Sequence, residues 1–219
     1  MADPNLSSLL KWSVEHSSAT TNDPSAPPPK SSLTPEALSA LFGGPSDADL
    51  MVESMTAITS PEISLDNKLI AFDNFEQLIE NLDNANNLSP LGLWTPLLAC
   101  LGDESSEMRM MAAWCVGTAV QNNEKSQERL LAMGGVPALV KVAVDEGEES
   151  QTRRKAVYAV SSAVRNFQAA MDVLVEELKQ KEEWGELGSV DAADMDAVDG
   201  VIGRLREEAK GKGKGKGET

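Results

Sequence analysis

The sequence predicts an all-α protein, an armadillo/HEAT-like right-handed helical solenoid with flexible termini. From about residue 64 to residue 178, apolar residues recur at helical spacing, and no segment alternates as a half-buried strand would. The helical sequence also repeats. MMAAWCVGTAVQNN at 110–123 is matched by RKAVYAVSSAVRNF at 154–167, a shift of 44 residues (154 − 110 = 44). A period in the low forties in a helical chain is typical of HEAT and armadillo repeats.

The first predicted region, residues 1–45, precedes the repeats. Residues 5–16 place leucines, a valine and a tryptophan at the spacing of a short amphipathic helix. Residues 17–32 are rich in Ser, Thr and Pro and offer little to bury, which predicts a disordered linker. A brief helix is expected at 34–42, with Thr as its N-cap and Pro at its first position.

Residues 46–178 form the predicted armadillo repeat domain. A helix at 46–58 is expected to act as a leading cap, because the terminal units of a solenoid are atypical. Three repeats follow, at about 64–91, 92–134 and 135–178. The duplicated string is interpreted as the long inner helix of each unit, packed against the next copy.

The first repeat is aligned with the second at a shift of 42 residues. This shift places Phe72 on Trp114 (114 − 72 = 42) and Gly92 on Gly134 (134 − 92 = 42). Because the shift varies between copies, we expect insertions in loops, such as the DEGEES segment at 145–150.

Two segments complete the chain. Residues 179–209 are predicted to form an acidic helical C-terminal segment of low apolar content. Residues 210–219 alternate Lys and Gly, which predicts a disordered Lys/Gly tail. The tail lacks the spacing of a phosphate-binding P-loop, and no strand precedes it.

Composition limits the classes of partner. The chain has 219 residues, with 35 acidic against 19 basic side chains and a formal charge of −16. Such a surface repels phosphate backbones and anionic lipid, so we expect no nucleic-acid partner and no membrane partner. Cys100 and Cys115 lie in apolar helical sequence without a CxxC motif, and no signal-peptide pattern is seen. A reduced, cytoplasmic location is expected.

Catalytic and cofactor motifs are missing from the sequence. The single histidine, His16, lies beside the predicted linker and has no rigid neighbour to orient it. The acidic cluster around Asp194 departs from a calcium loop, because Leu205 stands where the loop needs Glu. We therefore expect no enzyme activity, no cofactor and no metal.

The long inner helices are the expected partner surface. In importin-like armadillo proteins a Trp in this helix is followed four residues later by an Asn that clamps an extended peptide. Here Thr118 follows Trp114, and Ser162 follows Tyr158. The missing asparagines argue against an extended-peptide groove, though not against another partner.

A basic triplet, Arg153-Arg154-Lys155, begins the inner helix of the last clear repeat. It is consistent with a solvated helix edge and equally with a contact for an acidic partner surface. Asparagines gather at the ends of the inner helices, most densely at 79–87, where helix capping explains only part of them.

Several long motifs resemble one known family. KLIAFDNFEQLIENLDNANNL, LGLWTPLL, MAAWCVGTAVQNNEKSQ, RRKAVYAVSSAVRN and DMDAVD closely resemble the fungal cytosolic nucleotide exchange factors of heat-shock protein 70 chaperones. This is the armadillo-type Fes family, related to the animal heat-shock-protein-binding exchange factors. LSSLLKWSVEHS and LFGGPSDADLM are similar to the same family. Longer members continue with a further full repeat after residue 178, where this chain has the acidic segment.

The resemblance implies a monomer that binds the chaperone ATPase domain, favours its open state, accelerates ADP release and so promotes client release. The alternative is an armadillo-type adaptor for protein–protein interactions without exchange activity. The NLDNANN loop matches a family surface that touches the chaperone, and groove position adds residues from the next two helix ends. The predicted partner-binding residues are Asn84, Ala85, Asn86, Asn87, Asn122, Asn123, Arg165 and Asn166.

Overall fold

The computed structural model describes residues 43–211. The predicted helices at 5–16 and 34–42, the linker between them and residues 212–219 of the predicted tail lie outside this range. Every regular element in the described part is helical, which confirms the predicted fold class.

Ten α-helices and two short 3-10 helices make up the described residues. In chain order they are α3 (Asp47–Thr59), α4 (Leu65–Ile79), α5 (Leu82–Asn87), α6 (Trp94–Ala99), η1 (Cys100–Gly102), α7 (Ser106–Val120), α8 (Glu124–Ala132), α9 (Gly135–Val144), α10 (Ser150–Val164), α11 (Gln168–Lys179), η2 (Glu182–Trp184) and α12 (Met195–Gly211).

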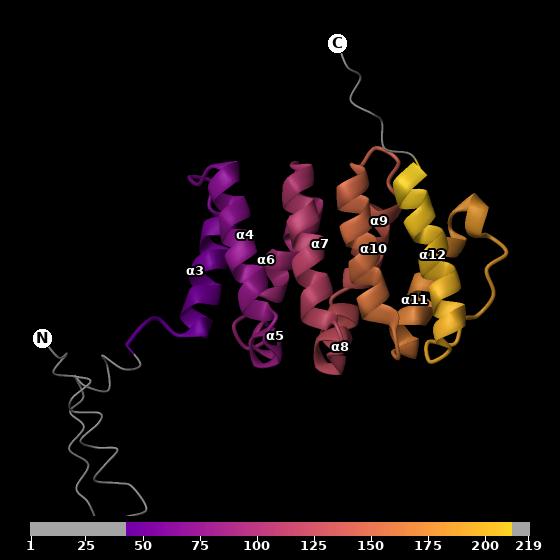
Figure 1. Cartoon of the computed structure of the whole chain (residues 1–219), viewed down its shortest axis with the longest axis horizontal. Coiled ribbons are helices and arrows are strands. Elements are labelled where there is room, and N and C mark those ends of the chain that lie inside the picture. The colour runs from indigo at the N-terminus through magenta and orange to yellow at the C-terminus, as the bar shows by residue number, and fades with distance from the viewer. Residues whose placement is uncertain (1–42, 212–219) are drawn as a thin grey trace, which may run out of the picture. The chain divides into compact units, whose positions relative to one another are not determined.

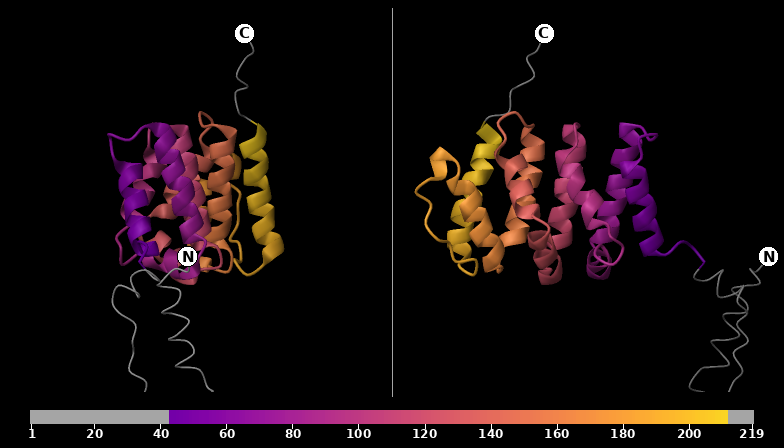
Figure 2. Two further views of the ribbon diagram at one scale, coloured as in Figure 1. Left: turned by 60° about the vertical axis from the view of Figure 1, so that its left-hand side comes forward. Right: turned by 180° about the vertical axis from the view of Figure 1, so that it is seen from behind.

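Four long helices, α4, α7, α10 and α12, stand side by side in one row, with α6, α9 and α11 behind them (Figure 1). The view from the opposite side shows the second layer in front (Figure 2). Helices α4, α7 and α10 have 15 residues each. Their first residues are 41 and 44 positions apart (106 − 65 = 41; 150 − 106 = 44). The row is therefore a solenoid of repeated units.

The register of the first repeat differs from the sequence alignment by one residue. The helix starts give a shift of 41, which places Asp73 on Trp114, whereas the sequence alignment placed Phe72 there. Phe72 is fully buried, while Asp73 is exposed and Trp114 is half-buried. The aromatic match is misleading because Phe72 is a fully buried core residue, whereas Trp114 packs at the edge of the core and is partly exposed.

The loops repeat as closely as the helices. Gly92 and Gly134 both adopt a left-handed backbone, with φ of 69° and 70°. Asn122 and Asn166, which follow α7 and α10, have φ of 53° and 56°. Gly and Asn are the residues that adopt this conformation at least cost, so they suit the turns that end helices.

Small residues let α7 and α10 approach closely. Ala112, Cys115 and Ala156 are fully buried between helices. A Cβ atom at Gly117 would lie only 2.5 Å from Cε1 of Tyr158, so glycine at this position lets the Tyr158 ring lie against α7, and any larger residue would displace the ring. This close packing fixes the positions of the side chains that α7 and α10 expose.

The last helix, α12, continues the row beside α10. Arg153 of α10 is 2% exposed and donates from Nε to Ala143 O at 3.1 Å and from Nη2 to Glu208 O at 2.8 Å. Ser150 Oγ donates to Ala209 O at 2.9 Å. These bonds hold the end of α12 against α10. The predicted domain limits at 178 and 209 stay predictions.

Candidate partner-binding surface

Two aromatic side chains mark the exposed side of the row formed by α4, α7 and α10, which we call the long-helix surface. Trp114 of α7 and Tyr158 of α10 occupy equivalent positions (158 − 114 = 44) and are half-buried. Each borders two hollows, so the surface is divided into two adjacent parts with different chemistry.

The first part, the polar hollow, has a volume of about 420 Å³. Thr118 Oγ1 donates to Glu76 Oε1 at 2.7 Å, which ties α7 to α4. The Tyr158 hydroxyl donates to Gln121 Oε1 at 3.0 Å, which ties α10 to α7. The residues that line this hollow are Glu76, Glu80, Trp114, Thr118, Gln121, Asn122 and Tyr158.

The second part, the basic hollow, has a volume of about 560 Å³. The Lys155 ammonium lies 3.3 Å from the centroid of the Trp114 ring, a cation–π contact. Burial lowers the pKa of Lys155, and attraction to Glu76 opposes part of this shift. The lining residues are Met110, Trp114, Gln151, Arg154, Lys155 and Tyr158, so the hollow holds two cationic side chains and no carboxylate.

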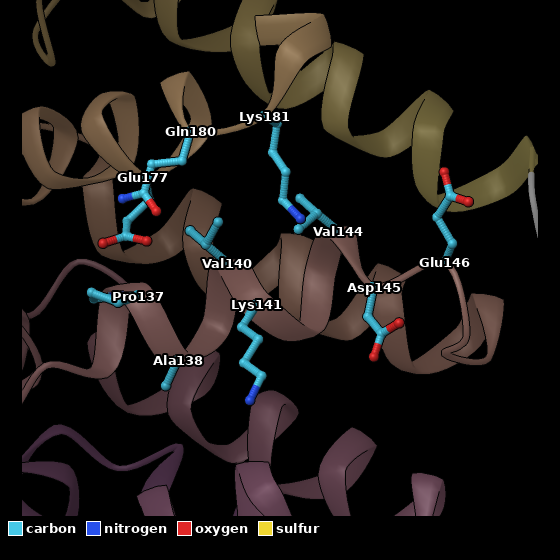
Figure 3. A pocket seen from close by; sticks show the side chains of 10 residues that line it. All are labelled: Pro137, Ala138, Val140, Lys141, Val144, Asp145, Glu146, Glu177, Gln180 and Lys181. Carbon is cyan, nitrogen blue, oxygen red and sulfur yellow. The ribbon is translucent and has the colours of Figure 1, made fainter. Parts of the chain in front are cut away.

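A third hollow lies on the opposite layer, between α9 and α11, with a volume of about 640 Å³ (Figure 3). Pro137, Val140 and Val144 contribute apolar surface. Its charged lining residues are Lys141, Lys181, Asp145, Glu146 and Glu177, so both signs are mixed at its rim. This hollow therefore has no electrostatic preference as clear as that of the basic hollow.

The predicted NLDNANN residues form α5. Asn84 is buried, and its Nδ2 donates to Asp47 Oδ2 at 2.8 Å and to Leu78 O at 2.9 Å. Ala85 is only 2% exposed. Asn86 and Asn87 are half-buried, and Asn86 Oδ1 has no hydrogen-bond partner among the described residues. The predicted loop is therefore a packed helix in which Asn84 and Ala85 are buried, Asn86 turns its side-chain oxygen inward, and only Asn86 and Asn87 are partly exposed.

The remaining predicted residues lie at the ends of α7 and α10. Asn122 is exposed and lines the polar hollow, and Asn166 is exposed at the equivalent position. Asn123 is buried as the N-cap of α8, where its Oδ1 accepts from Ser126 N–H at 3.4 Å. Arg165 pairs with Asp199 of α12, and this pairing lowers the pKa of the Asp199 carboxyl. Partner contact by these residues stays a prediction.

Sequence reasoning left out the residues that line the basic hollow. Trp114 and Tyr158 occupy matching positions of the repeat, and Arg154 and Lys155 belong to the basic triplet, but none of them is among the predicted partner-binding residues. Their helical phase was the available signal. Met110, Trp114 and Tyr158 fall on the half-buried side of α7 and α10, between the core and solvent.

The cysteines belong to the core, as predicted. Burial raises the pKa of the Cys100 thiol to about 11 and raises that of the fully buried Cys115 well above its ordinary value. Within residues 43–211, no cluster of three metal-ligating side chains is found. No helix in the same range has the length and apolar character needed to cross a bilayer.

Comparison with known proteins identifies the family. The model of the nucleotide exchange factor Fes1 matches residues 6–88, and that of the SIL1/FES1/HPBP1 C-terminal domain matches residues 84–177. The chain is 65% identical to the Hsp70 nucleotide exchange factor FES1 of Gibberella zeae, covering 95% of this chain and 98% of that protein. It is 53% identical to Hsp70 nucleotide exchange factor fes-1 of Neurospora crassa, over 95% and 99% of the two chains.

A third relative extends the same result. The chain is 49% identical to the Hsp70 nucleotide exchange factor FES1 of Coccidioides immitis, covering 94% of this chain and 98% of that protein. All three relatives are therefore matched almost from end to end, as the resemblance of the motifs predicts. This chain belongs to the Fes1 family of nucleotide exchange factors.

Proposed function

We propose that this protein is a nucleotide exchange factor for cytosolic Hsp70 chaperones. It binds the chaperone ATPase domain, favours the open state of that domain and accelerates the release of ADP. ATP then enters and the chaperone releases its client, which promotes protein folding. The observation that carries the proposal is the 65% identity over 95% of the chain to a protein named as an Hsp70 nucleotide exchange factor.

The mechanism needs binding energy and no covalent chemistry. A partner shifts a conformational equilibrium only by the ratio of its affinities for the two states. To raise the open population about 100-fold, the protein must bind the open ATPase domain about 100-fold more tightly than the closed one. A stack with close-packed helices suits this task, because a densely packed interior resists deformation and can present its surface in one arrangement.

The long-helix surface is the proposed contact for the ATPase domain. Side chains from three helices line its two hollows, so a folded partner would contact a broad, uneven surface. Thr118, at the position where peptide-binding armadillo proteins carry Asn, has its hydroxyl engaged by Glu76. This side chain is therefore committed within the stack, which favours a folded domain over an extended peptide.

Release of a fluorescent ADP analogue from a fungal cytosolic Hsp70 tests the proposal. We expect the release rate to rise with the concentration of this protein and to saturate. An unchanged rate at a concentration where binding is complete would refute exchange activity and leave the adaptor alternative. The proposed monomeric state and cytosolic location are checked by sedimentation of the pure protein and by fractionation of cells.

A further inference from the structure

The three consecutive basic residues of α10 have three different environments. Arg153 is buried and donates to backbone carbonyls of α9 and α12. Lys155 lies over the ring of Trp114. Arg154 is exposed and lines the basic hollow. The triplet is therefore neither a uniform solvated edge nor a uniform contact, and only Arg154 and Lys155 face the long-helix surface.

Neither of these two cations forms an ion pair within the described part of the chain, although Glu76 attracts Lys155 from beyond ion-pair distance. In residues 43–211, no carboxylate lies within ion-pair distance of Arg154 or Lys155, whereas Arg109 and Arg165 are paired with Glu148 and Asp199. The whole chain carries a formal charge of −16, so a hollow with two unpaired cations is a local reversal of its overall charge. Such a reversal favours an anionic partner group over a cationic one.

The walls of the hollow strengthen this preference. Met110, Trp114 and Tyr158 supply apolar surface beside the two charges, and a charge pair formed with less water around it is stronger. One face of the Trp114 ring is already covered by the Lys155 ammonium. A partner lysine or arginine would have to displace Lys155 to reach that face, and it would be repelled while doing so.

We propose that the basic hollow binds an Asp or Glu side chain on the surface of the Hsp70 ATPase domain, with Arg154 as the specificity-determining residue. The proposal rests on the proposed function and names the chemical group that this part of the surface recognises. The planar guanidinium of Arg154 can donate two parallel hydrogen bonds to a carboxylate. Lys155, which lies over the Trp114 ring, supplies a second positive charge from the next position of the same helix.

Charge reversal at Arg154 tests the proposal. We expect Arg154→Glu to weaken binding to a fungal cytosolic Hsp70 by roughly 10- to 100-fold, the range expected when a close interfacial charge pair is lost. Lys141→Glu, on the opposite layer, makes the same change in net charge and should keep affinity within about twofold of the original protein. Arg154 is exposed and its side chain makes no hydrogen bond or ion pair with any residue from 43 to 211, so both variants should melt as the original does.

A compensating change in the chaperone identifies the partner group. Each exposed Asp and Glu of the ATPase domain is changed in turn to Lys and titrated against Arg154→Glu. We expect one such change to weaken binding of the original protein and to restore binding of the variant. If no change restores it, or if Arg154→Glu binds as well as Lys141→Glu, the proposal is wrong.

These experiments distinguish a wrong carboxylate site from a wrong proposed function. If the original protein accelerates ADP release and Arg154→Glu does so at the same concentration, the carboxylate site is refuted and the function stands. If the original protein binds the chaperone without accelerating release, the function is refuted, and the binding titrations still decide whether Arg154 meets a carboxylate.

Discussion

Glu148, in the loop that precedes α10, is a buried charge bonded to Ser106 and Arg109 of α7. Its side chain is 3% exposed and accepts from Arg109 Nε at 2.5 Å, from Ser106 Oγ at 2.5 Å and from the Glu149 N–H at 2.8 Å. Burial alone raises the pKa of Glu148, but these hydrogen bonds outweigh burial and the pKa is lowered. The carboxylate therefore stabilises the folded state in its charged form.

We predict that Glu148→Ala lowers the free energy of unfolding by about 3 kcal/mol. Removing one partner of a buried ion pair costs about 3–5 kcal/mol. The lower end applies because Arg109 keeps its bonds to the carbonyls of Asp103 and Glu104. For a folded unit of this size the change corresponds to a fall in Tm of about 6–12 °C. The free energy of unfolding of Glu148→Gln should fall by less, because the glutamine amide oxygen can still accept a hydrogen bond from Ser106.

Thermal unfolding followed by far-ultraviolet circular dichroism measures the effect, with Glu149→Ala as the exposed neighbouring control. Because the folded pKa of Glu148 is below its ordinary value of 4.5, its contribution is present above that pH and is lost as pH falls through the folded pKa. The difference in stability between the original protein and Glu148→Gln should therefore shrink as the pH falls below 4.5. A Glu148→Ala protein that melts within about 2 °C of the original would refute the reasoning.

Three further changes probe the stack and its surface. Gly117→Ala should displace the Tyr158 ring, since the new Cβ would lie 2.5 Å from Cε1, and should reduce stimulated ADP release several-fold with little loss of helicity by circular dichroism. Arg153→Met should leave the Glu208 carbonyl of α12 and the Ala143 carbonyl of α9 without the guanidinium donor and speed hydrogen exchange in α12 at least tenfold, while Arg154→Met should not. Cys100 and Cys115 should resist alkylation at pH 8 in the folded protein, about 100-fold or more below a free thiol, and react on unfolding.

The fold was predictable because repetition multiplies a weak signal. A single apolar pattern is ambiguous, but Ala112 and Ala156, or Val120 and Val164, occupy the same buried place in successive units. The sequence alignment of the first two repeats was wrong by one residue, because large aromatic side chains occur both in the core and at its partly exposed edge. Phe72 resembles Trp114 in type, yet it is a core residue, and the helix starts show a shift of 41.

The continuation of the row by α12 was also hidden in the sequence. Its sequence is acidic and interrupted by glycines, which made it read as a segment outside the stack. Only a narrow apolar stripe is needed to dock a terminal helix, and Val198, Ile202 and Leu205 supply it at helical spacing. The polar character of the other faces is what a terminal unit needs, because no further unit covers it.

The partner-binding surface could be predicted only in part, because the rotation of a helix decides which of several consecutive residues is exposed to a partner. Successive residues on an α-helix point about 100° apart, as 3.6 residues complete a turn. Arg153, Arg154 and Lys155 therefore point in three directions: one into the core, one to solvent and one across to Trp114. A sequence shows three equal charges, and only the packing of α10 against α7 and α12 separates them. Close packing at Gly117 and the buried guanidinium of Arg153 fix the rotation of α10 about its own axis. This rotation leaves Arg154 exposed, which is why we expect the proposed carboxylate to bind Arg154 and not its neighbours.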